Sequence, residues 1–175
     1  MNNKTKKMVY ASLLTAMAII IPVQFSFLRV YIPPFSATLA AHVPMFVAML
    51  ISPGVAVTVG LGSTLGFLFT GLDIVVVLRA ATHILVGYVG AKIIAKRKNY
   101  LMAAIITAPI HGGLEMLVSI PFVGLDLYKL LIVTCVGAML HHSVDAFLSL
   151  IIVKASAKAG RKDFYIFFVG SGKNM

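Results

Sequence analysis

Three pairs of ionisable side chains lie four residues apart within apolar stretches of the sequence. The pairs are Arg79 and His83, His111 and Glu115, and His141 and Asp145. On a helix, residues four apart project from the same face. A guanidinium is a planar, permanently charged fork whose donors match a carboxylate. Because a charged side chain inside an apolar span is costly in lipid, these faces are expected to line a cavity or to meet a partner.

The same side chains raise the question of metal-dependent catalysis. Two sets carry nitrogen and oxygen ligands of the kind that zinc takes, namely His111 with Glu115, and His141 and His142 with Asp145. However, the HExxH order of zinc peptidases is absent, and no serine or cysteine stands beside an obvious base. The arginine of the first pair would also repel a cation in the same pocket. We therefore expect no enzyme, no catalytic residue, no bound metal and no other cofactor.

The composition is that of an integral membrane protein. The 175-residue chain is 60% hydrophobic and only 11% charged, and its mean hydropathy is +1.01. Soluble domains carry about a quarter charged residues. The expected fold class is therefore all-α, an integral membrane bundle of helices that forms a single domain over residues 1–175.

Six apolar stretches are expected to cross the membrane as helices. Their ranges are 8–23, 37–51, 55–69, 74–94, 100–122 and 130–153. Between the first two, Pro33 and Pro34 exclude a helix and favour an extended crossing. The basic and then aromatic tail, 154–175, is too short to span a bilayer, because a helical crossing needs about 20 residues. We expect this tail to lie on the cytoplasmic side, at the interface.

The net charge of +10 has the distribution of a topology signal. Most of the 15 basic residues fall in three clusters, at positions 4–7, 92–98 and 154–173. Six spans place all three clusters on one side of the membrane, and basic residues flanking spans mark the cytoplasmic side. Both termini are therefore expected to be cytoplasmic, where the clusters can meet anionic lipid headgroups of the bilayer. Nucleic acid is not an expected partner.

On this topology the polar pairs converge in the outer half of the bilayer. A helix rise of ~1.5 Å per residue puts Arg79 roughly 8 Å inside the outer end of its span. His83 lies one turn deeper, Glu115 is also in the outer half, and His111 is near mid-depth. A histidine of the sixth span, His141, is expected to join them in a pocket that opens outward. Two roles remain open for Arg79: an internal ion pair with Glu115, or the binding of an anionic substrate.

Several segments together resemble the S components of energy-coupling factor (ECF) vitamin transporters. The segments are IPPFSATLAAHVPMFVAMLISP, GLGSTLGFLFTG and VLRAATHILVG, together with six spans, cytoplasmic basic loops and small residues four apart in the first span. The resemblance covers residues 8–153. The niacin type is the most similar, with the pantothenate type as a rival, because pantothenate is also a carboxylate.

The resemblance implies the function of a vitamin-binding subunit in the bacterial cell membrane. Such a subunit binds its vitamin outside and docks on a transmembrane coupling subunit that carries two ATPases, so ATP is used by the partners. Consistent with this division, the chain has no Walker lysine motif. The implied contacts with the coupling subunit are Ala11, Ser12, Thr15 and Ala16, although the chain lacks a literal AxxxA motif there.

The resemblance also implies a binding site. Arg79 would pair with the vitamin carboxylate, His83 and His111 would provide hydrogen bonds, and Glu115 would orient a histidine or meet a ring nitrogen. The loop after the first span would act as a lid. The implied substrate-binding residues are Phe35, Ser36, Thr38, Arg79, His83, His111, Glu115 and His141. Two other classes of protein remain open, a stand-alone carrier or channel and an intramembrane metal-dependent enzyme.

Overall fold

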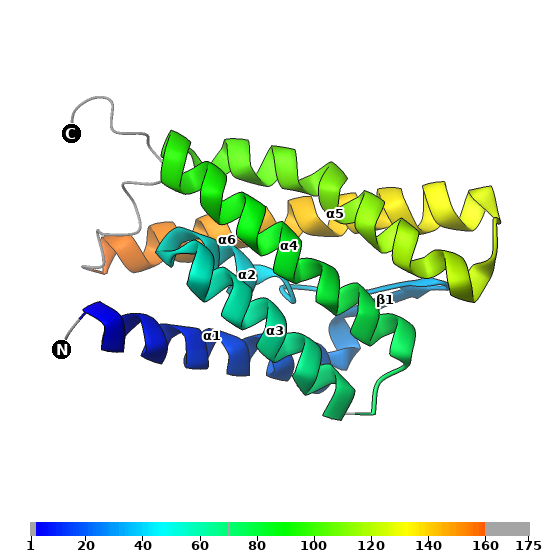
Figure 1. Ribbon diagram of the computed structural model, residues 1–175, viewed down its shortest axis with the longest axis horizontal. Coiled ribbons are helices and arrows are strands. Elements are labelled where there is room, and N and C mark those ends of the chain that lie inside the picture. Colours follow the sequence, from blue (N-terminus) through cyan, green and yellow to red (C-terminus); the bar gives the residue numbers. More distant parts are fainter. Residues whose placement is uncertain (1–2, 70, 160–175) are drawn as a thin grey trace.

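The computed structural model describes residues 3–69 and 71–159, which form a helical bundle closed on one face by a small hairpin (Figure 1). In chain order the elements are α1 (Asn3–Gln24), the 3-10 turn η1 (Ser26–Leu28), β1 (Arg29–Ile32), β2 (Phe35–Thr38), α2 (Val43–Ile51), α3 (Pro53–Phe69), α4 (Ile74–Arg97), α5 (Tyr100–Val123), the π-helix η2 (Tyr128–Val136) and α6 (Gly137–Lys158). Of the expected tail, Lys154 and Lys158 belong to α6, and residues 160–175 lie outside the described part of the chain.

Four described helices are long and apolar enough to cross a membrane: α1, α4, α5 and the continuous helix from η2 through α6. Helix α3 is shorter but equally apolar, with 17 residues. The helices carry large apolar side chains both on the faces that point into the bundle and on the faces that point outward. Many of these side chains are exposed, as in a protein that packs against lipid. The predicted helical membrane bundle is therefore confirmed, whereas the number of crossings stays a prediction.

The structure departs from the expected all-α fold between α1 and α3. Strands β1 and β2 pair antiparallel, from Arg29 opposite Thr38 to Ile32 opposite Phe35, and Pro33 and Pro34 form the turn. Residues 37–42 of the expected second span are thus in β2 and in a turn, where Ala40 adopts a left-handed conformation with φ 69°. Proline lacks the N–H of a helix interior and suits a helix start, so Pro44 stands in the first turn of α2 instead of inside a longer helix.

Helix α2 is too short to span a bilayer by itself. Its nine residues extend about 13.5 Å, less than half of a hydrocarbon core of about 30 Å. Seven of the nine residues are buried. The apolar stretch that predicted a second span is therefore explained by packing inside the bundle more than by contact with lipid.

The described residues of the three basic clusters gather at one end of the bundle (Figure 1). The N-terminal end of α1, the junction between α4 and α5, and the C-terminal end of α6 lie together on the left of Figure 1, and the hairpin lies at the opposite end. Lys98 ends α4 in a left-handed conformation, and Asn99 caps α5 by accepting a hydrogen bond from the Met102 N–H at 2.9 Å. This arrangement is compatible with the predicted cytoplasmic location of the three clusters.

Helices α3 and α4 approach closely because α3 lacks a side chain at Gly60. A Cβ atom added there would lie 2.9 Å from the Cα of Ile84, next to His83. Real Cβ atoms do not approach backbone so closely, so this glycine sets the position of the helix that carries Arg79 and His83.

Replacing Gly60 with alanine is therefore expected to destabilise the protein. Overpacking costs about 1–3 kcal/mol, which exceeds the gain of up to about 1 kcal/mol in helix propensity. Thermal unfolding of the purified protein in detergent measures the difference. Gly54→Ala is the matched control, because an added Cβ at Gly54 meets nothing within 4 Å. Equal stability of the two variants would contradict this explanation of the α3–α4 contact.

Candidate functional site

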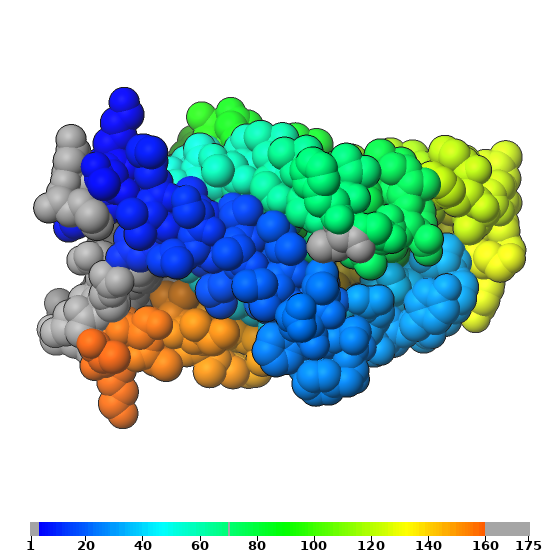
Figure 2. All heavy atoms as spheres, turned by 90° about the horizontal axis from the view of Figure 1, so that it is seen from below, coloured from blue at the N-terminus to red at the C-terminus, as the bar shows by residue number. Residues whose placement is uncertain are grey.

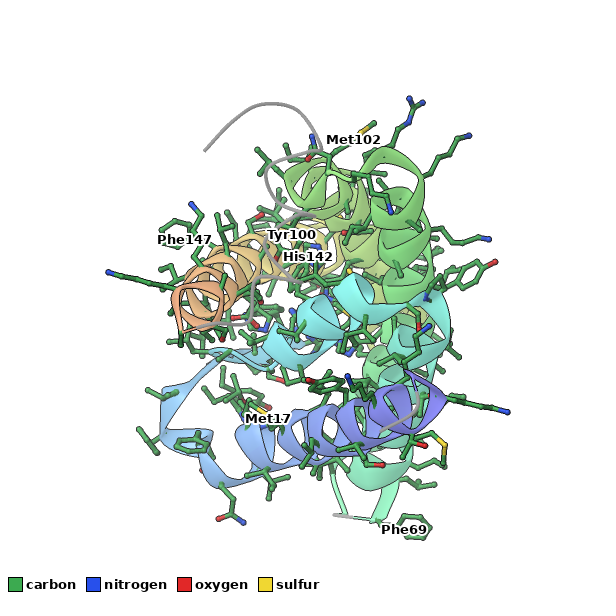
Figure 3. The ribbon with its side chains drawn as sticks, turned by 90° about the vertical axis from the view of Figure 1, so that its left-hand side faces the viewer. Met17, Phe69, Tyr100, Met102, His142 and Phe147 are labelled. Carbon is green, nitrogen blue, oxygen red and sulfur yellow. The ribbon has the colours of Figure 1, made fainter. Side chains whose placement is uncertain are left out.

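All five histidines of the chain gather in the interior, although they come from four different parts of the fold. His42 precedes α2, His83 is on α4, His111 is on α5, and His141 and His142 are adjacent on α6. The ring of His42 is central, with its centroid 4.4–5.9 Å from those of the other four. Figure 3 shows His142 in the interior near Tyr100, whereas Phe147, Met102 and Phe69 project outward.

Arg79 and Glu115 form a buried ion pair beside this histidine cluster. The Nε and Nη2 groups of Arg79 donate to Oε2 of Glu115 at 3.1 and 2.8 Å. Both side chains are about 95% buried. The other carboxylate oxygen of Glu115, Oε1, lies 3.6 Å from Nε2 of His111. Of the two roles left open for Arg79, the structure contains the internal ion pair.

Arg79 also holds the hairpin in place. Its Nη1 donates to the Pro34 carbonyl at 3.3 Å, and its Nη2 donates to the Ser36 carbonyl at 3.0 Å. The guanidinium lies 5.5 Å from the centre of the Phe35 ring, a cation–π arrangement. The Phe35 ring packs against Gly137, where an added Cβ atom would lie 3.3 Å from the nearest ring atoms. Arg79 thus joins Glu115 on α5 to the turn and second strand of the hairpin.

Asp145 fixes the connection between β2 and α2. Its two carboxylate oxygens accept the backbone N–H groups of Ala40 and His42, both at 2.8 Å. The nearest ring nitrogens are those of His42 at 3.6 Å and His141 at 3.4 Å. The side chain is fully buried, and no lysine or arginine of the described chain pairs with it. Among the described residues, histidines are therefore the only prospective cationic partners of this buried carboxylate.

The histidine cluster is only partly satisfied by hydrogen bonds. His42 Nε2 lies 3.0 Å from His83 Nε2, and His142 Nε2 lies 3.0 Å from Thr107 Oγ1. Several buried ring nitrogens have no hydrogen-bond partner in the described part of the chain: Nδ1 of His42, both nitrogens of His111, Nε2 of His141 and Nδ1 of His142. Because leaving a buried polar group unpaired costs about 1–3 kcal/mol, these nitrogens are suited to a ligand.

A cavity of about 80 Å³ lies between α1, the hairpin, α3 and α4, and reaches the edge of the histidine cluster. At about 10–15 Å³ of such space per water molecule, it has room for several waters or a small ring compound. Its polar lining consists of Arg29, Ser36, Thr38, His42, Ser63, Arg79, His83, Glu115 and His141. Figure 2 shows the face on which α1 and the hairpin lie side by side over this region.

Arg29 is the second arginine of the cavity wall, and its charge is not balanced. Its Nη2 donates to the Pro22 carbonyl at 2.6 Å, and its Nε donates to Thr38 Oγ1 at 3.3 Å. No carboxylate in the described residues pairs with it, unlike Arg79. Arg29 is therefore the cation of this cavity that remains available to an anion.

Most of the residues implied by the resemblance are brought together by the fold. Six of them line the cavity: Ser36, Thr38, Arg79, His83, Glu115 and His141. The other two do not line it. Phe35 packs behind Arg79, and His111 lies deeper, fully buried between Glu115 and His42.

Four residues of the site were not among those expected to bind substrate: Arg29, His42, His142 and Asp145. The i, i+4 spacing of His141 and Asp145 indicated a shared face, but the long-range bonds of Asp145 to the segment before α2 have no local signal. No local pattern in the sequence singles out His42 or Arg29 as a residue of the site. The place of Arg29 beside Pro22 and Thr38 depends on the hairpin.

The four small residues expected to contact a coupling subunit do not share one environment. Ala11 is buried, and Thr15 packs against α3, where an added Cβ at Gly62 would meet its side chain. Ser12 and Ala16 are exposed on the outer side of α1. Ala11 and Thr15 are thus used inside this fold, and Ser12 and Ala16 remain available for an external partner.

A comparison with known proteins finds a relative that is described as the niacin transporter NiaX of Lactococcus lactis subsp. cremoris (strain MG1363). The two sequences are 32% identical over 177 residues, which cover 93% of this chain and 79% of the relative. No family model matches the sequence, and no solved structure matches it. The similarity to this relative extends over most of the chain. It supports the niacin type and gives no support to the pantothenate type.

Proposed function

Because the chain belongs to the family of the niacin transporter NiaX, the niacin-type S components of ECF transporters, we propose that it binds niacin for uptake into the cell. The protein is a multi-pass membrane protein of a bacterium. In the proposed cycle it takes the vitamin from outside and delivers it through a coupling subunit and two ATPase subunits.

The observation that carries this proposal is the cavity with one unbalanced arginine. Nicotinate, the anionic form of niacin, is a pyridine ring with one carboxylate, and it needs a cation at one edge and a hydrogen-bonding group at another. Arg29 offers the cation, since Arg79 is occupied by Glu115 and the hairpin. His83 and His141 border the same cavity and offer ring nitrogens to the pyridine. We therefore assign the carboxylate to Arg29.

In this proposal Arg79 and Glu115 control the lid. The hairpin covers the cavity, and its residues Pro34 and Ser36 are held by Arg79 through their carbonyls. Loss of these two hydrogen bonds would free the hairpin to move away from α4 while Arg79 stays paired with Glu115. His111 would support Glu115 from behind rather than touch the vitamin.

Two measurements test the proposed transport function. Mass spectrometry of small molecules released from gently purified protein is expected to identify nicotinate. Liposomes containing this chain alone are expected to show no nicotinate uptake, whereas liposomes that also contain the coupling subunit and ATPases are expected to accumulate nicotinate when ATP is supplied. Uptake by the chain alone would favour a stand-alone carrier, and release of a different vitamin would contradict the niacin assignment.

Replacement of Ala16 with leucine is expected to weaken docking without altering vitamin binding. Ala16 is exposed on α1, away from the cavity, and a bulky side chain prevents the close helix approach that small residues allow. The measurement is the amount of coupling subunit that co-purifies with the variant, alongside its affinity for nicotinate. Ser143→Leu, a change at an exposed position on α6, is the matched control. Full recovery of the coupling subunit with Ala16→Leu would exclude this face of α1.

A further inference from the structure

We propose that His42, His111 and His142 bind a divalent transition-metal ion of the zinc type beside the vitamin cavity. This site goes beyond the proposed function, since it can be occupied and measured without any vitamin. From the sequence we expected no bound metal, and the proposed site differs from that expectation.

The three imidazoles are close enough to share one ion. One ring nitrogen from each residue lies within 4.8 Å of those of the other two. Their ring centroids are 4.7 Å apart for His42 and His111, 5.3 Å for His111 and His142, and 5.9 Å for His42 and His142. Zinc–nitrogen bonds of about 2.0–2.1 Å in tetrahedral geometry require nitrogens about 3.3 Å apart, so small side-chain rotations suffice.

The ring nitrogens of this set are free to act as ligands. Each of the three residues has at least one buried ring nitrogen without a hydrogen-bond partner in the described part of the chain. The other nitrogen of His142 faces Thr107 Oγ1 at 3.0 Å, which orients the ring as the outer hydrogen bonds of metal-binding histidines do. An ion bound through these unpaired nitrogens would satisfy three buried groups at once.

The charges of the surroundings admit a cation. The sequence led us to expect that Arg79 would repel a cation. In the structure, however, the charge of Arg79 is balanced by Glu115 at 2.8 Å. Asp145, fully buried, contributes a negative charge next to His42, and no lysine or arginine of the described chain pairs with it. A divalent ion at His42 would therefore lie next to a carboxylate that no lysine or arginine of the described chain neutralises.

The all-histidine set is preferred over two alternatives that include a carboxylate. Those alternatives are His42, His141 and Asp145, and His83, His111 and Glu115. In each the carboxylate is already engaged, Asp145 by two backbone N–H groups and Glu115 by Arg79. Three imidazoles favour zinc, nickel, copper or iron over magnesium and calcium. His42 also borders the cavity, so this set lies next to the vitamin site.

The close approach of α5 to η2 supports this geometry. Gly112 follows His111, and a Cβ added there would lie 2.7 Å from the Cys135 carbonyl oxygen. The absence of a side chain brings α5 against the helix that carries His142. The arrangement of His111 and His142 is thus fixed by the backbone, which lowers the entropic cost of forming the site.

The test uses the full-length protein purified without chelators, incubated with Zn²⁺ or Co²⁺ alone and then freed of unbound ion. We expect about one ion per chain by elemental mass spectrometry, removal by a strong chelator, and a visible absorption spectrum of tetrahedral type with Co²⁺. X-ray absorption at the zinc edge should show scattering from histidine. No retained ion above the buffer blank, or an ion held without histidine scattering, would overturn the proposal.

Substitutions assign the ligands. His111→Gln and His142→Gln are expected to lose the ion, whereas His83→Gln and His141→Gln are expected to keep it. Retention by His142→Gln together with loss by His141→Gln would move the ion to the set with Asp145 and overturn this assignment. If a variant fails to fold, the X-ray absorption of the unmodified protein decides the question. Because the measurements report only the ion and its ligands and no nicotinate is added, failure of the vitamin assignment leaves these results unchanged.

Discussion

Replacement of Arg79 with methionine is expected to destabilise the protein by about 3–5 kcal/mol, the largest effect on stability anticipated here. The reason is that Glu115 would remain buried with its charge unpaired and with two charged hydrogen bonds lost. The change also removes the donors to the Pro34 and Ser36 carbonyls. Thermal and denaturant unfolding of the purified variant in detergent measure this loss.

A double substitution separates the buried charge from other effects. Arg79→Met combined with Glu115→Leu removes both charges and is expected to recover most of the lost stability, because a buried ion pair is often worth no more than apolar residues of similar volume. Lys129→Met provides the exposed control, since Lys129 pairs with Asp126 at the surface, where ion pairs contribute little. If the double variant is as unstable as the single one, the ion pair does not explain the burial of Arg79.

Replacement of Arg29 with glutamine is expected to weaken nicotinate binding about 10- to 100-fold. A hydrogen bond to a charged group is worth about 1.5–3 kcal/mol, and each 1.4 kcal/mol is about tenfold in affinity. Arg29 lines the cavity and has no carboxylate partner among the described residues, so its removal leaves no buried charge behind. Calorimetric titration of the purified variant with nicotinate measures the change.

Two comparisons make this result specific. Lys129→Gln removes the same charge at a distance from the cavity and is expected to leave nicotinate affinity unchanged. Binding of nicotinamide, the neutral amide of the same ring, should be nearly insensitive to Arg29→Gln. The opposite result would be an unchanged nicotinate affinity in Arg29→Gln together with loss of nicotinate binding in Arg79→Met/Glu115→Leu. That result would assign the vitamin carboxylate to Arg79.

Local spacing predicted the parts of the site that lie on single helices. Arg79 with His83 and His111 with Glu115 share helix faces because they are four residues apart, and apolar composition placed them on long helices. Their convergence followed from topology alone. These inferences needed only the period of the helix and the cost of a charge in lipid.

The parts that sequence could not predict depend on contacts between distant segments. Asp145 accepts the Ala40 N–H across 105 positions of the chain, and this bond places His42 at the centre of the histidine cluster. No local pattern around His42 indicates that contact. The predicted second span, 37–51, begins too early for a similar reason. The apolar pattern of residues 37–42 is as consistent with a strand and a buried turn as with a helix.

The most direct test of anion recognition by the cavity compares nicotinate with nicotinamide in equilibrium titrations of the unmodified protein under one set of conditions. The two ligands share a ring and differ in the carboxylate, so their ratio of affinities reports whether the cavity recognises an anion. We expect nicotinate to bind at least about tenfold more tightly, which is the value of one charge-assisted hydrogen bond. Equal affinity for the two ligands, or preference for the amide, would contradict it.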